Sequence, residues 1–207
     1  MPSSATLATL TVRVQNLLAD TGADIFPAAS ITEAIRLAFQ EYNTRRPLPV
    51  VGQLTVSAAG REQALASLTD LVSISSVWFP YTAATPEFPP SWVHWTIFDN
   101  AGTLTLFIDD QRVAAPAVGK VLRIFYNKLH TLNGLDSATA TTYNAGDDNI
   151  IVLGAAGYAC LTRSVDLNET SANFAISTPN YGALGAGFLS EFRYLLNAPS
   201  IHGRELV

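Results

Sequence analysis

The sequence predicts an α+β protein: a four-helix bundle of two N-terminal and two C-terminal helices, with an antiparallel β-region inserted between the pairs. Three observations predict this fold. Apolar residues repeat at helical spacing near both ends of the chain, they alternate with period two through its middle, and an uncharged stretch follows the alternating region. We expect a helical domain at 1–47 and 147–196, a β-lobe with a long connection at 48–146, and an extended C-terminal tail at 197–207.

Two amphipathic helices open the chain. Ser30 and Glu33 are spaced as a capping box for the second helix, which must end before Pro47. Gly22 is placed to cap the end of the first helix. The two predict an antiparallel helical hairpin joined by a short loop. The first helix is indicated by apolar residues at helical spacing, namely Leu7, Leu10, Val14, Leu17 and Leu18.

The middle of the chain reads as short strands. Asp99–Gly102 separates two strongly alternating segments and predicts a hairpin turn. A proline-rich loop at 85–90 interrupts the pattern. We expect a small antiparallel sheet or open barrel from six segments, at 53–57, 63–68, 71–79, 92–98, 103–109 and 121–128.

Residues 149–162 read NIIVLGAAGYACLT and contain no charge. Asp147 and Asp148 precede them and Arg163 follows, as a helix macrodipole favours, and the two acids are expected to cap the helix. Fourteen residues are too few to cross a bilayer, which takes about 20, so we expect this helix to pack against protein. Its small residues would let another helix approach closely, within the subunit or between subunits; the candidates are Gly154, Ala155, Gly157 and Ala159.

A last helix and a tail complete the chain. Leu184, Phe188, Phe192 and Leu195 mark the helix, and the glycine-rich run 182–187 is expected to be its flexible entry. The tail from Asn197 onward has no core of its own. Such segments are free or dock on a partner, and the candidate docking residues are Asn197, Ile201, His202, Arg204 and Leu206.

Composition favours a subunit of an assembly. Hydrophobic residues make up 48% of the chain and charged residues 14%, where about 25% is usual. The net charge is −5, and Arg45-Arg46 is the only adjacent basic pair, so the chain lacks the clustered cations that grip DNA. Cys160 is the single cysteine and is expected to be a buried apolar residue, in a protein that folds in a reducing cytoplasm.

Residues suited to catalysis or metal binding do not converge in the sequence. His94, His130 and His202 are far apart, and Asp109-Asp110 offers too few oxygens for calcium. His94 and His130 are expected at the surface. We therefore predict no enzyme, no catalytic residue, no metal site and no cofactor.

Aromatic residues gather between Trp78 and Trp95, and this cluster has two interpretations. One is a platform for carbohydrate or peptide. The other, which we favour, is the core of the β-lobe with a protein contact at its rim, because the spacing of Trp92 and Trp95 does not put both rings on one sheet face.

The order of segments resembles the head–tail adaptors of tailed bacteriophages, also called neck, connector or head-completion proteins. The resemblance lies in VRVQNLLADTGADIF, ITEAIRLAFQEYNTRRP, the β-insert ending in LRIFYNKLHTLNGLD, and DDNIIVLGAAGYACLTR. It spans roughly residues 10–165 and rests on the order and texture of the segments.

This resemblance implies a structural virion protein. Such adaptors form a ring, usually of twelve subunits, beneath the portal; they extend the DNA channel without sequence-specific binding and offer a docking surface to the tail or nozzle protein. The C-terminal segment would reach the portal. The implied location is the neck of a virion, made in the bacterial host cytoplasm, with no membrane contact. Other interpretations remain open: a tail-completion or baseplate subunit, and a carbohydrate-binding module.

Overall fold

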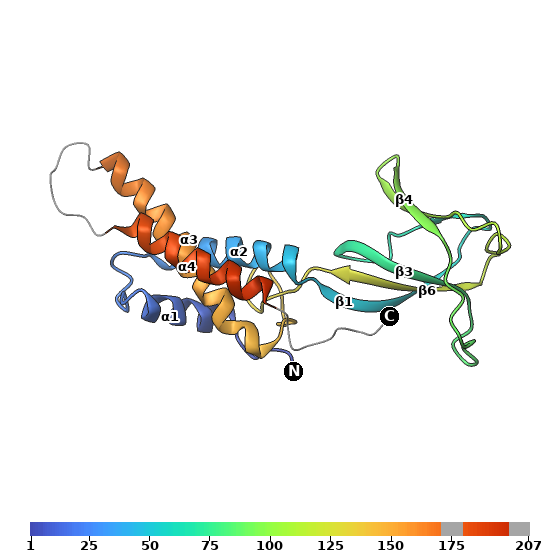
Figure 1. Cartoon of the computed structure of the whole chain (residues 1–207), viewed down its shortest axis with the longest axis horizontal. Coiled ribbons are helices and arrows are strands. Elements are labelled where there is room, and N and C mark those ends of the chain that lie inside the picture. The colour runs from blue at the N-terminus through green and yellow to red at the C-terminus, as the bar shows by residue number, and fades with distance from the viewer. Residues whose placement is uncertain (171–179, 199–207) are drawn as a thin grey trace. The chain divides into compact units, whose positions relative to one another are not determined.

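The computed structural model describes residues 1–170 and 180–198, and these fold into two compact units (Figure 1). The helical unit holds Met1–Arg46 and the described chain from His130 onward. The β-unit holds Pro47–Leu129. Four of the expected tail residues, Ile201, His202, Arg204 and Leu206, lie outside the described residues.

Four helices make up most of the helical unit: α1 (Leu7–Leu17), α2 (Ala28–Arg45), α3 (Asp148–Thr170) and α4 (Tyr181–Asn197), with a 3-10 turn η1 (Ala145–Asp147) leading into α3. Helix α3 packs against each of the other three helices. All four contribute side chains to one apolar core, in which Leu10, Ile35 and Phe192 are among the fully buried residues. The α+β class is confirmed.

Both N-terminal helices are capped differently from the sequence prediction. The predicted capping box is wrong: α2 begins at Ala28, so Ser30 lies in its first turn, and Glu33 pairs with Arg36. Gly22 is not the cap of α1 either. That helix ends at Leu17, and Ala19 takes the left-handed conformation (φ 53°).

Helix α3 is longer than the uncharged stretch predicted, because it continues past Arg163 to Thr170. Residues 145–167 are long and apolar enough to cross a membrane by length and composition. Length therefore no longer argues against a membrane span. Burial does, because half of that stretch is covered by the protein itself, including Ala155 and Cys160, which are fully buried.

The glycine-rich run 182–187 is not a flexible entry to the last helix. It lies inside α4, which begins at Tyr181 with the side chain of Asn180 as its cap. Gly185 is buried against α3, so close packing keeps this glycine in a helix interior. Phe188, Phe192 and Leu195 pack on the core as predicted, whereas Leu184 is exposed.

The β-unit consists of two three-stranded antiparallel sheets. Strands β1 (Leu48–Thr55), β6 (Val121–Lys128) and β3 (Leu71–Tyr81) form one sheet in the order β1-β6-β3. Strands β2 (Glu62–Ala64), β5 (Thr103–Ile108) and β4 (Trp95–Asn100) form the other, in the order β2-β5-β4. Aliphatic residues from both sheets fill a second core, including Val77, Leu106 and Ile124. Each of the six predicted strand segments overlaps one of these strands, and the hairpin turn between β4 and β5 is confirmed. The strands form two sheets, where a single sheet or open barrel was expected.

The connection at 130–146, which we expected to belong to the β-lobe, is part of the helical unit. Leu132, Leu135 and Tyr143 are buried in the helical core. The backbone N–H of Ser3 donates to the carbonyl of Tyr143, and that of Leu7 to the carbonyl of Asn133. The N-terminal segment and this connection therefore hold each other against the helices.

Candidate assembly surfaces

The small residues of α3 allow α4 to approach very closely. A Cβ atom added at Gly157 would lie 2.7 Å from Cγ of Leu189, and one at Gly154 would lie 2.9 Å from the ring of Phe192. Across the same contact, a Cβ at Gly185 would lie 2.9 Å from the carbonyl oxygen of Gly157. Such distances leave no room for a side chain, so α3 and α4 meet backbone to backbone.

The small residues of α3 lie inside the helical core. Ala155 and Ala159 are buried in the same helical core, as are both glycines. All four predicted packing residues therefore lie together in the core of the subunit. The close contacts of Gly154 and Gly157 are made with α4 of the same chain.

Asp147 and Asp148 do more than precede a helix. Asp147 accepts hydrogen bonds from the Tyr42 hydroxyl (2.6 Å) and from Arg46 (3.0 Å). Asp148 accepts from the Ser3 hydroxyl (2.7 Å) and pairs with Arg13 at 3.0 Å. Burial, and then the bond to Asp147, raise the pKa of Tyr42 far above its usual value, so this hydroxyl remains a donor. The two acids thus anchor the start of α3 to α1, α2 and the N-terminal segment.

Arg46 caps the end of α4. Its guanidinium donates to the backbone carbonyls of Leu195 (2.7 Å), Leu196 (3.2 Å) and Ala198 (3.0 Å), and it pairs with Asp147. These carbonyls carry the negative end of the helix dipole and lack partners within the helix. A single side chain therefore fixes the position from which the chain leaves α4 toward the predicted tail.

A second ion pair joins α2 to α4. Arg193 donates to Glu41 at 2.8 Å, and the Tyr158 hydroxyl of α3 donates to the same carboxylate at 2.6 Å. The hydrogen bond from Arg193 lowers the pKa of Glu41. A small cavity of about 290 Å³ lies here, lined also by Arg45, Leu196 and Asn197. Asn197 is exposed and is the one predicted tail residue within the described chain.

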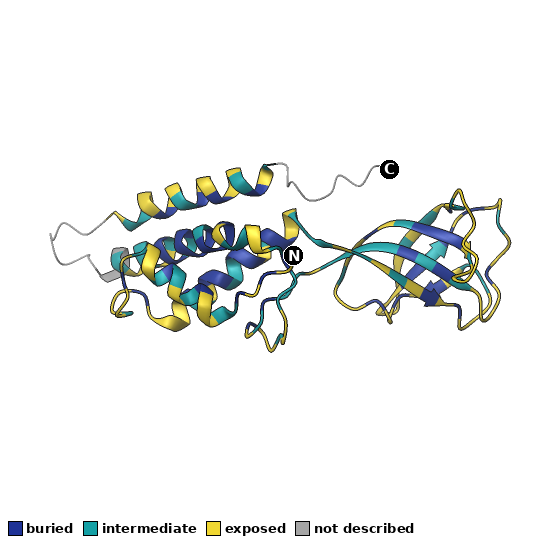
Figure 2. Cartoon of the chain, turned by 90° about the horizontal axis from the view of Figure 1, so that it is seen from below, coloured by how far each residue is buried: buried dark blue, intermediate teal, exposed yellow. Residues whose placement is uncertain are grey.

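The outward faces of α1 and α4 are nearly free of charge. Helix α1 has one charged residue, Arg13, and it is paired with Asp148. Helix α4 has two, Glu191 and Arg193, the latter paired with Glu41. Helix α1 packs mainly on α2 and α3, and α4 mainly on α3, so the two faces are separate surfaces. Their exposed uncharged residues are Ala8, Thr9, Val12, Asn16 and Leu17 on α1, and Ala183, Leu184, Ala186, Gly187, Ser190, Tyr194 and Asn197 on α4. Figure 2 colours the exposed positions of the helices yellow.

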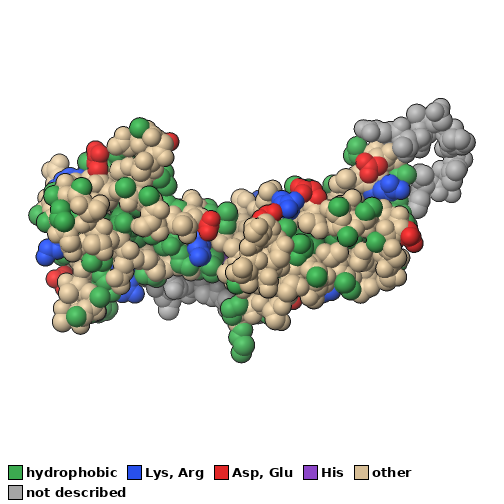
Figure 3. Space-filling view, turned by 180° about the vertical axis from the view of Figure 1, so that it is seen from behind, with side chains coloured by type: hydrophobic (Ala, Val, Ile, Leu, Met, Phe, Trp, Pro, Cys, Tyr) green, Lys and Arg blue, Asp and Glu red, His purple; other side chains and the backbone are tan. Residues whose placement is uncertain are grey.

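Charge is sparse over the side of the molecule in Figure 3, where hydrophobic and neutral polar atoms predominate and acidic and basic side chains are scattered. No basic stripe crosses this face. The arrangement agrees with the absence of a basic run in the sequence, and it offers no track of phosphate-binding cations there.

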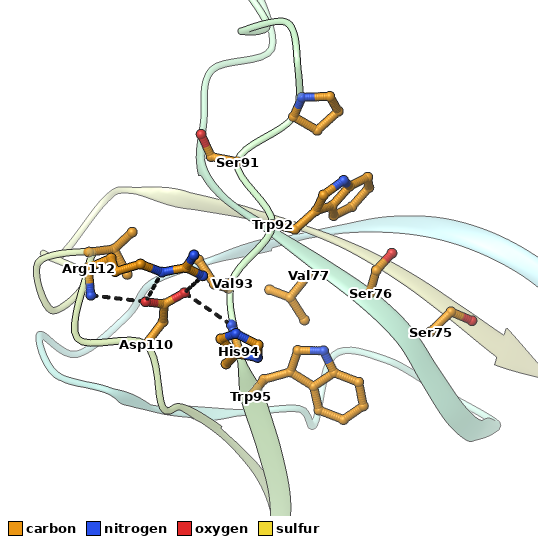
Figure 4. Close-up of a pocket in the computed structure, with 12 residues that line it drawn as sticks. Ser75, Ser76, Val77, Ser91, Trp92, Val93, His94, Trp95, Asp110 and Arg112 are labelled. Atoms are coloured by element: carbon orange, nitrogen blue, oxygen red, sulfur yellow. Dashed lines mark hydrogen bonds and ion pairs between the residues drawn. The ribbon is translucent and has the colours of Figure 1, made fainter. Parts of the chain in front are cut away.

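A pocket of about 690 Å³ opens on the β-unit (Figure 4). Trp92 and Trp95 lie on its wall with Ser75 and Ser76. Asp110 is buried at its margin and pairs with Arg112 at 2.6 Å, which holds the pKa of this carboxyl well below its usual range. Asp110 also accepts from the backbone N–H of His94 at 3.3 Å. The acid therefore organises the loop rather than presenting an open charge.

Aromatic rings surround Arg123 beside this pocket. The guanidinium carbon lies 5.2 Å from the ring centre of Tyr81, 5.4 Å from Phe125 and 5.7 Å from Trp78, within cation–π range. Trp92 contacts the rings of Trp78 and Phe125 and is still 48% exposed. Trp78 is buried in the β-unit, as the core interpretation expects, and Trp92 lies at the surface, as the platform interpretation expects. The sequence did not single out Arg123 or Phe125.

The described residues hold no group of three or more histidine, cysteine, aspartate or glutamate side chains able to bind a metal. His94 is exposed, as expected. His130 is half-buried, with its ring near Tyr42 and its Nδ1 near the Thr142 hydroxyl at 3.2 Å. Cys160 is buried as predicted, and burial raises the pKa of its thiol to about 11.

No protein-family model matches the chain, and no curated protein is significantly similar to it. Among solved structures, similar chains occur in the neck of an empty gene transfer agent particle computed with C6 symmetry (TM-score 0.31), in the virion of the native gene transfer agent particle (0.32), and in the neck of the native particle computed with C12 symmetry (0.28). Each is 14% identical, and the match covers 91% of this chain and 93% of that chain. With TM-scores below 0.5, the likeness by itself establishes neither fold nor role.

Proposed function

We propose that the chain is a structural neck protein of a virion, a head–tail adaptor that forms a ring beneath the portal. Its ring would extend the DNA channel and provide the docking surface for the tail. The order of segments that resembles this family supports the proposal. The observation that carries it is the pair of separate, nearly uncharged helix faces on α1 and α4.

A ring needs two different surfaces on each subunit, one for each neighbour, because head-to-tail contacts repeat around the closed assembly. In this proposal the four helices act as a bundle whose α1 face meets the α4 face of the next subunit. Small residues such as Ala186 and Gly187 suit a close helix contact, and Val12 and Tyr194 supply apolar area. Twelve subunits remain the expected number.

The tail from Asn197 onward is proposed to bind the portal. Arg46 supports this assignment, because it fixes the end of α4 from which the tail departs. Deleting residues 197–207 is expected to give heads that package DNA but do not hold it or join tails. Normal joining by the truncated protein would refute the tail assignment.

Matched charge variants test the ring contact. Val12→Glu places an acid on the outward face of α1, where the contact would bury it without a partner. We expect particles carrying this variant to lack the neck ring in electron micrographs. Val118→Glu is the control, because Val118 is exposed to a similar degree in the β-unit. Complete rings with Val12→Glu would contradict the contact.

Two other functions are separable by experiment. A tail-completion or baseplate subunit would appear elsewhere in the particle by the same microscopy. A carbohydrate-binding module is favoured by one observation, the half-exposed Trp92 beside the 690 Å³ pocket. It predicts a glycan-array signal that Trp92→Ala abolishes, and an array without signal would rule it out.

A further inference from the structure

Three of the four outer strands of the β-unit carry a feature that discourages further pairing. Strand β1 contains Pro49, and β2 has only three residues. Strand β3 has three irregularities in its register with β6, and residues 91–93 cover its far end through backbone bonds to Val77 and Phe79. Proline, short length and bulges are the usual protections of a sheet edge.

Strand β4 has none of these protections. Its six residues, WTIFDN, include no proline and no lysine. Its register with β5 is continuous from Trp95, opposite Ile108, to Asn100, opposite Thr103. The strand does contain one acid, Asp99. The carboxylate of Asp99 accepts a hydrogen bond from the N–H of Gly102 in the turn, at 2.6 Å. The other side of β4 is therefore a regular, unguarded edge.

The turn determines which backbone groups this edge offers. Ala101 and Gly102 both have positive φ (51° and 84°), as a two-residue type I′ hairpin requires. In such a hairpin Asn100, Phe98 and Thr96 exchange hydrogen bonds with β5. The N–H and C=O groups of the alternate residues, Trp95 and Ile97, then point to the open edge. Neither has a backbone partner among residues 1–170 and 180–198.

Apolar side chains flank the edge on both faces. Phe98 is 37% exposed on one face of β4. On the other face Trp95 lines the pocket of about 690 Å³, together with Ser75, Ser76 and Val77 of β3 (Figure 4). A strand laid along β4 would place alternate side chains beside Phe98 and beside Trp95 and Ile97.

We propose that the free edge of β4 binds an extended, uncharged and alternately apolar segment of a different protein by strand addition. A second copy of this chain fits less well. Among the strands that the structure describes, its other edges carry protections, so a second copy would pair through its own β4. Two antiparallel registers share the same overlap, Ile97 opposite Ile97 and Phe98 opposite Phe98, and they would set Asp99 of each copy against Trp95 or Ile97 of the other. This site does not depend on the proposed ring.

A synthetic peptide with the sequence of residues 103–108, TLTLFI, is a suitable uncharged probe, because this sequence already pairs with β4 from its other side. Added to the full, isotope-labelled chain, it should slow hydrogen exchange of the Ile97 amide about tenfold or more. Phe98→Lys should weaken peptide binding about tenfold, because it places a charge on the edge strand beside the added segment.

Leu104→Lys is the matched control. Leu104 is 42% exposed and lies in the same hairpin, but on the inner strand β5, so peptide affinity should change no more than about twofold. Protection of the Thr96 and Phe98 amides verifies that both variants keep the hairpin. Absence of Ile97 protection, or equal loss of binding in both variants, would overturn the proposal. Ile97 protection in a dimer without peptide would assign the edge to a second copy instead.

Discussion

The stretch 149–162 of helix α3 and residues 95–98 of strand β4 both lack charge, and the structure places the two in different environments. The uncharged residues of α3 are mostly buried within the helical unit, where Gly154 and Gly157 contact α4. Those of β4 lie at a sheet edge with an exposed Phe98 and open backbone groups. A lack of charge in sequence therefore does not distinguish a buried helix from a strand at a sheet edge, and only the packing separates the two.

The largest effect should come from filling the α3–α4 contact. Gly157→Leu would force a side chain into Leu189, so we expect a loss of stability of about 3 kcal/mol or more, at the upper end of overpacking costs. Urea unfolding and alkylation of buried Cys160 would both report it. Gly187→Leu is the control, since nothing lies within 4 Å of a Cβ there. Equal stability of the two variants would mean that α3 and α4 are not closely packed.

Removing the cap of α4 should have the next largest effect. Arg46→Ala deletes the hydrogen bonds to three carbonyls and leaves Asp147 without its cation, which should destabilise the helical unit by about 2 kcal/mol. Arg46→Lys should recover only part of this, because an ammonium cannot reproduce the guanidinium fork. Full stability of Arg46→Ala in urea unfolding would show that the cap is dispensable.

A pair of tryptophan variants compares the inside of the β-unit with its surface. Trp78 is 6% exposed, so Trp78→Ala should reduce stability by about 3 kcal/mol. Trp92→Ala should reduce it by only about 1 kcal/mol, because this ring is half-exposed and loses mainly its contacts with Trp78 and Phe125. Thermal unfolding would measure both. The reverse order would place Trp92 in the core.

The smallest effect concerns pH. Because Arg193 lowers the pKa of folded Glu41, this group stabilises the fold above its unfolded pKa of about 4.3, and the contribution disappears as pH falls through the lower folded value. Glu41→Gln should therefore flatten the fall in stability below about pH 4.3, measured by urea unfolding at successive pH values. An identical pH profile in wild type and variant would exclude this contribution.

Periodicity predicted the elements, but long-range contacts decided their details. Alternation located all six strands, and helical spacing located all four helices. The capping box failed because α2 begins at Ala28, so that Ser30 lies inside the helix and not at its cap. The glycines of α4 look like a flexible segment in isolation, and the close approach of Gly157 explains why Gly185 lies inside a helix.

The candidate surfaces were less predictable than the elements. Arg46 is predicted only as half of a basic pair, yet the carbonyls that it binds lie about 150 positions further along the chain. Of the four small residues of α3 singled out in the sequence, Gly154 and Gly157 lie at contact distance from α4. The sequence left open whether these residues pack within or between subunits. Their contact with α4 is a long-range contact, which no local sequence pattern predicts.

Asn43, near the end of α2, contacts the residue that directly follows the β-unit. The Asn43 side chain accepts from the N–H of His130 at 2.7 Å and donates to its carbonyl at 3.4 Å. The helical unit thus holds together both ends of the segment 47–129. Relative to the helical unit, this segment is one long closed loop. Because closure entropy grows only slowly with loop length, such a loop can be shortened or exchanged at modest thermodynamic cost. The β-unit could therefore be replaced as a whole. A short glycine–serine linker in its place should leave a helical unit that still folds.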